Sequence, residues 1–296
     1  MFRGRISLQI TILSLFLAVV LPLAMVIVGL NYRLARVSAA EAASILVAEV
    51  SHTVASEVGR LFDSAATLAE LGTRMPSNSA PPADGHPLLP VMMDALVALP
   101  DLASVYIGFA NGDFLRVAQL GTGYDRERAA VAGPDGTTTG IQIINGQGDA
   151  RQQVWSFLNA QREKLGANPT PTPAYNPSAR PWYQQATAAP GTLVSTAPYA
   201  FATAGSMGIT IARSIDGPGA PVFGVDIALA GLSLFLDRLR QRMDHPIGVA
   251  VFDQTGVVLA TASSMSNASG TVPKIANLQD EALRAAAAEY FTTNLP

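Results

Sequence analysis

The hydrophobic pattern begins with a long apolar segment at the N-terminus. Residues 8–30 are almost wholly apolar, and residues 6–32 contain no charged side chain. At about 1.5 Å per residue, this segment can cross a hydrocarbon core of about 30 Å as a helix. The alternative is a signal peptide cleaved near 37–39, but its apolar region would normally be only about 7–15 residues long. We therefore predict a transmembrane helix within residues 1–32. Arginines flank it on both sides, and the N-terminal amine favours a cytoplasmic N-terminus.

The segment after the anchor predicts one long helix. Proline is absent from residues 32–74, and apolar residues recur along one stripe at near-heptad spacing. The stripe comprises Val47, Val50, Val54, Val58, Phe62, Ala65 and Ala69. It can pack on a following domain or pair with a second copy of itself. We assign residues 33–74 as a signalling helix and expect a homodimer through it, with packing on its own domain as the alternative.

Short runs with helical or alternating patterns follow and indicate an α+β domain. Asn111-Gly112, between alternating apolar residues, is a strong signal for a hairpin turn. The elements predicted in this half are a loop at 75–82, a short helix at 90–99, a hairpin at 104–118, a helix or strand-helix segment at 154–165 and a proline-rich loop at 168–173.

The C-terminal half predicts more strands and an amphipathic helix. The predicted elements are strands at 192–200, 208–214 and 221–227, a helix at 228–243 and a second hairpin at 248–261. The second hairpin repeats the pattern of the first: an aliphatic strand, an aromatic residue, a polar turn with glycine and another strand. We therefore expect a second module of the same kind to begin at residue 244 and to be incomplete at Pro296, as in an N-terminal fragment or a truncated gene product.

Composition argues against several functional classes. The formal net charge is −3, from 19 basic and 22 acidic residues, and there is no basic stripe that would bind nucleic acid. Cysteine is absent, which excludes disulfides and thiolate chemistry. The three histidines are far apart and show no metal-ligand spacing, and no Gly-x-Ser-x-Gly elbow occurs. We predict no catalytic residue, metal or cofactor in this chain.

The densest chemistry lies in residues 175–183, where an arginine, a tryptophan and two tyrosines occur together. A guanidinium presents its N–H donors in a fixed geometry that matches a carboxylate. Aromatic side chains supply flat apolar walls, and tyrosine and tryptophan keep one polar group each. This combination favours holding a small organic anion over transforming it.

The order of these elements, with the Tyr175-x4-Arg180-Pro-Trp182-Tyr183 motif, resembles the double Cache (dCache) family of sensor domains. The resemblance runs from about residue 33 to residue 296. It implies two PAS-like antiparallel-sheet modules along one long helix. The membrane-distal module, at 75–243, would bind the ligand, and 244–296 would begin the membrane-proximal one.

A longer signature marks the amino-acid-binding subset of this family, and its six positions match Tyr175, Arg180, Trp182, Tyr183, Tyr199 and Asp226. The resemblance implies that Arg180 and Trp182 hold the carboxylate of a ligand, while Asp226 and a tyrosine hold its ammonium group. The ligand would be an amino acid or an organic acid. In the alternative interpretation Trp182 belongs to the core, Tyr183 caps a sheet edge, and Arg180 pairs directly with Asp226.

The resemblance implies the sensor region of a bacterial transmembrane receptor, in the inner membrane with its sensor in the periplasm. The run from Tyr106 to Val117 is similar to Cache sensors that precede adenylate or guanylate cyclase domains. Chemoreceptor, histidine kinase and diguanylate cyclase outputs are alternatives. A membrane-anchored extracytoplasmic enzyme or adhesin is the alternative from a different class.

Overall fold

A computed structural model describes residues 8–75, 80–171, 175–215, 220–241, 248–262, 274–278 and 280–294. The chain forms two compact units, residues 1–58 and 59–296. Helix α1, Leu8–Arg74, is continuous and contains Pro22, so the predicted helices before and after residue 32 are confirmed as one helix. Within the described residues it is the one helix long and apolar enough to cross a membrane, by length and composition only.

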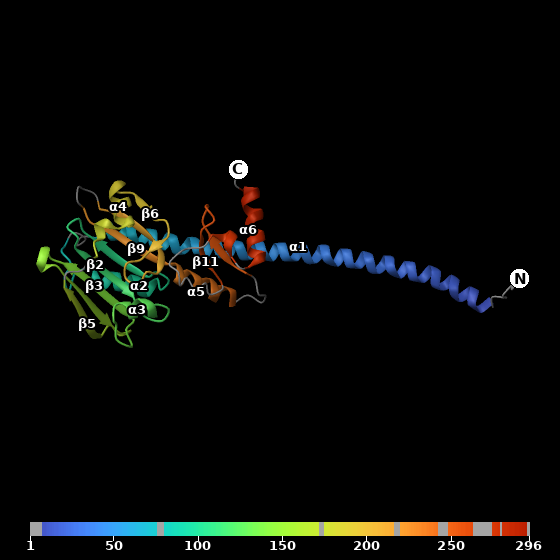
Figure 1. Cartoon of the computed structure of the whole chain (residues 1–296), viewed down its shortest axis with the longest axis horizontal. Helices are drawn as coiled ribbons and strands as arrows, with labels where there is room; N and C mark the ends of the chain where they lie inside the picture. The colour runs from blue at the N-terminus through green and yellow to red at the C-terminus, as the bar shows by residue number, and fades with distance from the viewer. Residues whose placement is uncertain are drawn as a thin grey trace. The chain divides into compact units, whose positions relative to one another are not determined.

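Nine strands in the described part of the second unit form one antiparallel sheet. The strands are β1 Ser104–Gly108, β2 Phe114–Gln119, β3 Thr139–Asn145, β4 Gln152–Leu158, β5 Lys164–Pro171, β6 Leu193–Ser195, β7 Tyr199–Ala200, β8 Met207–Ser214 and β9 Val222–Ala228. Their order is β5-β4-β3-β2-β1-β9-β8-β6, and β7 also pairs with β8. In Figure 1 the sheet extends from β5 at one edge to β6 at the other. The predicted α+β class, with a long N-terminal helix and an antiparallel-sheet module, is confirmed.

Both predicted hairpins are confirmed. In the first, β1 pairs with β2, and Gly112 turns the chain with a φ of +88°. This φ lies in the left-handed region that glycine adopts without steric cost. In the second, β10 (Ala250–Phe252) pairs with β11 (Val258–Thr261), and Gly256 has a φ of +79°.

The predictions between residues 139 and 200 are partly wrong. Residues 154–165 are not helical: they form most of β4, a turn and the start of β5. The predicted loop at 168–173 is strand as far as Pro171. Strand β5 lies at the edge of the sheet, where proline is tolerated because one side of the strand needs no N–H donor. Residues 172–174 lie outside the described residues. The run at 192–200 is two short strands, β6 and β7, and strand β3 was not predicted.

The helices of the second unit pack on the nine-stranded sheet or connect its strands, except α6, which packs beside the second hairpin. They are α2 Leu89–Ala98, α3 Asp125–Ala130, α4 Pro181–Ala188, α5 Leu229–Gln241 and α6 Glu281–Asn294, with 3-10 turns η1 Gly148–Ala150, η2 Pro177–Ala179 and η3 Ile275–Asn277. The helices predicted at 90–99 and 228–243 are thus present, with 242–243 outside the described residues. Helix α4 begins with Pro181, a residue that suits the first turn because its missing N–H is unpaired there anyway.

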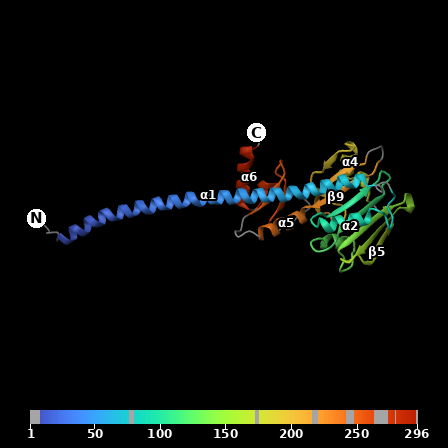
Figure 2. The same ribbon diagram turned by 180° about the vertical axis from the view of Figure 1, so that it is seen from behind.

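The main core lies on one face of the sheet. Alternate strand residues such as Val105, Val117 and Val225 are fully buried on this face. Helix α2 packs against them, together with Ala65, Ala69 and other residues of the last turns of α1. Figure 2 shows the C-terminal part of α1 and α2 in front of this face. Here the end of the predicted apolar stripe packs on its own domain.

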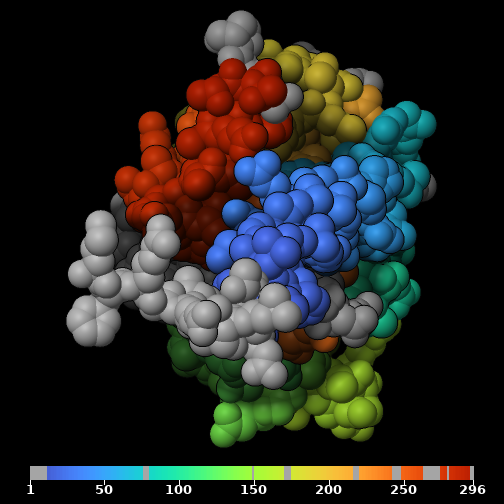
Figure 3. Space-filling view, turned by 90° about the vertical axis from the view of Figure 1, so that its right-hand side faces the viewer, coloured from blue at the N-terminus to red at the C-terminus, as the bar shows by residue number. Residues whose placement is uncertain are grey.

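A smaller core lies near the C-terminus. Val258, Ile275, Leu278 and Ala287 are buried together, with Phe252 and other partly buried residues around them. Helix α6, red in Figure 3, lies at the surface of the molecule. The predicted boundary between modules at 243–244 lies outside the described residues, so the assignment of 244–296 to a second module stays a prediction.

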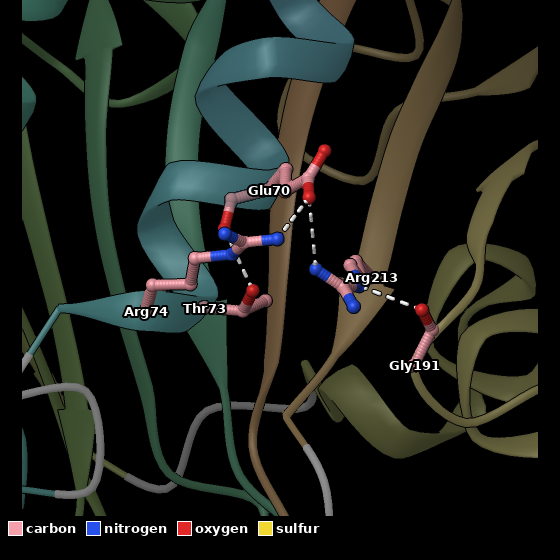
Figure 4. Close-up of polar contacts among 5 residues, drawn as sticks. All are labelled: Glu70, Thr73, Arg74, Gly191 and Arg213. Carbon is pink, nitrogen blue, oxygen red and sulfur yellow. Dashed lines mark hydrogen bonds and ion pairs between the residues drawn. The ribbon is translucent and has the colours of Figure 1, made fainter.

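One polar cluster connects α1 to the sheet (Figure 4). The Glu70 carboxylate lies 3.6 Å from the Arg213 guanidinium of β8 and 2.5 Å from the Arg74 guanidinium. Arg213 Nε also donates to the Gly191 carbonyl oxygen at 2.8 Å. The strand that carries Arg213 also contributes Thr210 to the opposite face of the sheet, where the candidate site lies.

Candidate ligand-binding site

The candidate site lies on the face of the sheet opposite α2. Tyr106 of β1 pairs with Arg116 of β2, Arg116 with Gln142 of β3, and Gln142 with Trp155 of β4. Residues paired directly across antiparallel strands point to the same side, so these side chains form one row. On the other side of Tyr106 the row continues with Gly224. A Cβ at Gly224 would lie 2.3 Å from the Tyr106 ring, so only glycine leaves room for this ring.

A cavity of about 230 Å³ opens on this row. Sites for drug-sized ligands occupy roughly 300–1,000 Å³, so this cavity suits a small molecule. Its lining comprises Tyr106, Phe114, Arg116, Ala130, Val131, Gln142, Gln153, Trp155, Asn168, Tyr175, Arg180, Trp182, Tyr199, Phe201, Ala202, Thr203 and Asp226. Five of the six residues predicted from the motif therefore meet at one cavity, and Tyr183 is the exception.

Asp226 forms the acidic end of the cavity and is only 4% exposed. Its Oδ1 accepts hydrogen bonds from the hydroxyls of Tyr106 at 2.7 Å and Thr210 at 2.6 Å. Its Oδ2 accepts one from Ser104 Oγ at 2.7 Å. A carboxylate has about four acceptor positions, so this carboxylate can accept a further donor such as an ammonium group.

Tyr199 extends this network. Its hydroxyl lies 2.7 Å from Thr210 Oγ1, and because Thr210 donates its own proton to Asp226, Tyr199 is the donor. Burial raises the pKa of Tyr199, and the nearby Asp226 charge raises it further. Burial also raises the pKa of Tyr106, with the same contribution from Asp226. Both phenols therefore stay protonated at neutral pH and act as donors.

Arg180 forms a basic end of the cavity. It is the residue before α4, and its guanidinium donates to the Ala200 carbonyl oxygen at 2.7 Å. Its Cζ lies 5.3 Å from the centre of the Tyr199 ring, within the range of a cation–π contact. Between described residues there is no ion pair from Arg180 to Asp226, so the alternative of a direct structural pair is wrong. The two opposite charges both lie at the cavity and remain available to a ligand.

Aromatic side chains form much of the wall of this site. Trp182 is 1% exposed and lies 4.8 Å from the Tyr106 ring, measured between ring centroids. It is thus both a core residue and part of the cavity wall. Tyr175 packs on Phe114 at 5.0 Å, and burial raises its pKa to about 12. Tyr183 packs edge-on against Trp182 at 5.5 Å and supports the wall without lining it.

The motif did not indicate Tyr106, Thr210, Ser104 or Arg116. The signal for Tyr106 and Arg116 was the alternation in the first predicted hairpin, where both interrupt a series of aliphatic residues. Arg116 is 9% exposed, donates to Thr203 Oγ1 at 2.8 Å and lies 5.9 Å from the Trp155 ring centre. In the described part of the chain, no group of three or more His, Asp or Glu side chains could hold a metal ion.

Comparison with known sequences finds two signalling proteins. The chain is 27% identical over 234 residues to "Adenylate cyclase 1" of Rhizobium meliloti, a match that covers 75% of this chain and 34% of that protein. It is 40% identical over 87 residues to the methyl-accepting chemotaxis protein McpB of Bacillus subtilis, which covers 29% of this chain and 12% of that protein. The chain therefore spans about a third or less of the length of these relatives. No family model matches the chain.

Comparison with solved structures finds chemoreceptor sensor domains at low sequence identity. The ligand-binding domain of Campylobacter jejuni Tlp3 with 4-methylisoleucine has a TM-score of 0.43 at 15% identity and covers 73% of this chain and 68% of its own. That of Pseudomonas fluorescens CtaA with L-isoleucine has a TM-score of 0.41 at 17% identity, covering 77% and 68%. A protein described as "Methyl-accepting Chemotaxis protein X" has a TM-score of 0.47 at 16% identity, covering 83% and 80%. The chain is thus similar to chemoreceptor ligand-binding domains and, distantly, to a cyclase.

Proposed function

We propose that this chain is the ligand-sensing region of a bacterial transmembrane receptor and binds a small amino acid or carboxylate outside the cytoplasm. The observation that supports this best is the pair of opposite charges at one small cavity. Asp226 keeps an acceptor position for an ammonium group, and Arg180 presents a guanidinium without a carboxylate partner among the described residues. An α-amino acid needs both groups, and the buried setting of Asp226 strengthens its contact with an ammonium group.

The remaining parts of the proposal concern the whole receptor. The apolar part of α1 would anchor the chain in the inner membrane, with the sensor in the periplasm and a homodimer formed through the long helix. Residues 75–243 would be the membrane-distal module and 244–296 the start of the membrane-proximal one. Ligand binding would then act on the end of α1, which packs on the sheet. The sequence similarity to a cyclase favours an adenylate or guanylate cyclase output, and the similarity to a chemoreceptor favours a chemotaxis output.

The test of ligand binding is calorimetry on the full 296-residue chain in detergent micelles. The panel comprises amino acids, organic acids without an amine and amines without a carboxylate. Because Arg180 is half-buried, Arg180→Ala should weaken every carboxylate ligand by about tenfold to a hundredfold, which corresponds to about 1.5–3 kcal/mol for a hydrogen bond to a charged group. Ligands that bind Arg180→Ala as tightly as the parent would show that this pocket is not the site.

A matched control separates the site from a general effect of charge. Arg238 lies on α5, forms an ion pair with Asp101 and does not line the cavity. Arg238→Ala removes the same charge from the surface, where such pairs contribute little. Its ligand affinities should equal those of the parent, and an equal loss in both variants would contradict the assignment of Arg180.

A further inference from the structure

We infer that the ligand carries a second anionic group, bound by Arg116, and that the site selects an amino acid with a carboxylate side chain. This inference rests on the proposed amino-acid binding and goes further, because it names the class of side chain. Arg116 is outside the motif that the sequence matched, and it belongs to the sheet, whereas Arg180 belongs to the start of α4.

The first observation is that Arg116 is buried without a counter-charge. Its NH1 donates to Thr203 Oγ1, and its guanidinium lies over the Trp155 ring, but its Nε has no hydrogen-bond partner. None of the described carboxylates forms an ion pair with it. A guanidinium at 9% exposure without an anion is unfavourable, and fixed donors that point at a cavity suit a ligand carboxylate.

The second observation is the balance of charge around the cavity. The lining residues that carry a formal charge are two arginines, Arg116 and Arg180, and one carboxylate, Asp226. A zwitterion with a neutral side chain would leave one guanidinium uncompensated. An acidic amino acid brings one ammonium and two carboxylates, so each of the three charged residues gains an opposite partner. Aspartate and glutamate therefore match this site better than aliphatic amino acids.

The third observation is the polar surrounding of Arg116. Gln142 pairs with it across β2 and β3, and Gln142 Nε2 donates to Gln153 Oε1 at 2.8 Å. Asn168 of β5 pairs with Trp155 of β4 and therefore belongs to the same row, three strands from Arg116. These amides can bind carboxylate oxygens but carry no charge that would compensate Arg116. This end of the cavity, which Ala130, Val131 and Trp155 also line, therefore offers polar contacts to an anionic side chain.

The experiment is calorimetry on the full chain with pairs of ligands that differ only in charge. L-glutamate and L-glutamine form one pair, and L-aspartate and L-asparagine the other. The acids should bind about tenfold to a hundredfold more tightly than their amides, the effect of one charge-assisted contact. Arg116→Gln should bring each pair within about threefold while the amides keep parental affinity. Arg238→Gln, which removes a surface charge from α5, should leave both ratios unchanged.

Different failures are distinguishable. If both members of each pair bind the parent equally, or if Arg116→Gln weakens acids and amides alike, the inference is wrong while amino-acid binding stands. If succinate binds as tightly as L-aspartate, Asp226 holds no ammonium group, and both the inference and the amino-acid proposal fail. Should Arg116→Gln lose its cooperative thermal transition, Arg116→Lys takes its place. The lysine keeps the positive charge but lacks the paired N–H donors of the guanidinium. It should therefore keep a reduced preference for the acids. A lysine variant with no preference would overturn the inference.

Discussion

Replacing Asp226 with asparagine should separate the charge of this residue from its role as a hydrogen-bond acceptor. The amide oxygen can still accept from Tyr106 and Thr210, as Oδ1 does in the parent. The amide nitrogen can donate to Ser104 Oγ, because a serine hydroxyl rotates and also accepts. All three hydroxyls therefore keep a partner in Asp226→Asn. In Asp226→Ala all three lose the carboxylate, and only Tyr106 and Thr210 can still bond to each other, across 3.1 Å.

The sizes of these effects predict a clear difference in stability between the two variants. Hydrogen bonds to a charged group contribute about 1.5–3 kcal/mol, and neutral ones about 0.5–1.5 kcal/mol. Each of the three bonds is therefore about 1 kcal/mol weaker in Asp226→Asn, which costs this variant about 3 kcal/mol in all. Removing a buried charge without a cationic partner among the described residues recovers several kcal/mol. The free energy of unfolding of Asp226→Asn should therefore lie within about 1 kcal/mol of the parent. Asp226→Ala should lose at least about 2 kcal/mol, at about 1–3 for each of the two hydroxyls left without an acceptor.

The assay combines urea denaturation, followed by circular dichroism, with calorimetry of ligand binding. Both variants remove the anion that would hold an ammonium group, so both should bind amino acids at least about 30-fold more weakly. Carboxylates without an amine should keep their affinity in Asp226→Asn. An asparagine variant as unstable as the alanine variant would refute the stability argument. Parental amino-acid affinity in Asp226→Asn would refute the ammonium contact.

Three further changes test the packing, the phenols and the contact with α1. Gly224→Ala places a Cβ 2.3 Å from the Tyr106 ring and should destabilise the domain by about 1–3 kcal/mol, measured in urea; parental stability would contradict this packing. Because burial raises the pKa of Tyr175 from 10.0 to about 12, its contribution to stability is complete below pH 10 and is lost as the pH rises to 12. Tyr175→Phe should abolish that part of the loss, and an unchanged pH profile would exclude it. Glu70→Gln removes the ion pairs with Arg213 at 3.6 Å and with Arg74 at 2.5 Å and should cost about 0.2–1 kcal/mol for each, measured in urea; a total loss above about 2 kcal/mol would contradict the assignment of both as surface pairs.

The parts of the fold that sequence predicted correctly carry local signals. The turn at Asn111-Gly112 needs a positive φ, which Gly112 has, and its strands alternate in polarity. Helix α5 follows from its apolar stripe. In each case the residues that determine the element lie within a few positions of one another.

The segment from β3 to β5 lacks such signals. Gln152, Gln153, Pro169 and Pro171 are typical of loops, and here they form strands because the neighbouring strand supplies the hydrogen bonds. Proline is tolerated in β5 because the strand lies at the edge of the sheet. This context is a property of the folded sheet and cannot be read from the segment alone.

The site shows the same division. The motif located Arg180 and Asp226, but their surroundings depend on the pairing of β1 with β9, which joins Ser104 to Asp226. Strand register between segments so distant in sequence is set by the whole sheet. Alternation in β1 and β2 could have placed Tyr106 and Arg116 on a polar face, but not beside Asp226. The charge count that distinguishes an acidic ligand from an aliphatic one needed the folded cavity.

The two faces of the sheet explain how a ligand could act on the long helix. Thr210 and Arg213 are three residues apart on β8, so their side chains point to opposite faces. Thr210 donates to Asp226 in the site, and Arg213 pairs with Glu70 of α1 on the other side. An ammonium group at the remaining acceptor position of Asp226 would bind the same carboxylate that Thr210 contacts. Strand β8 is therefore in direct contact with both the candidate site and α1, so a shift of this strand would act on the helix directly.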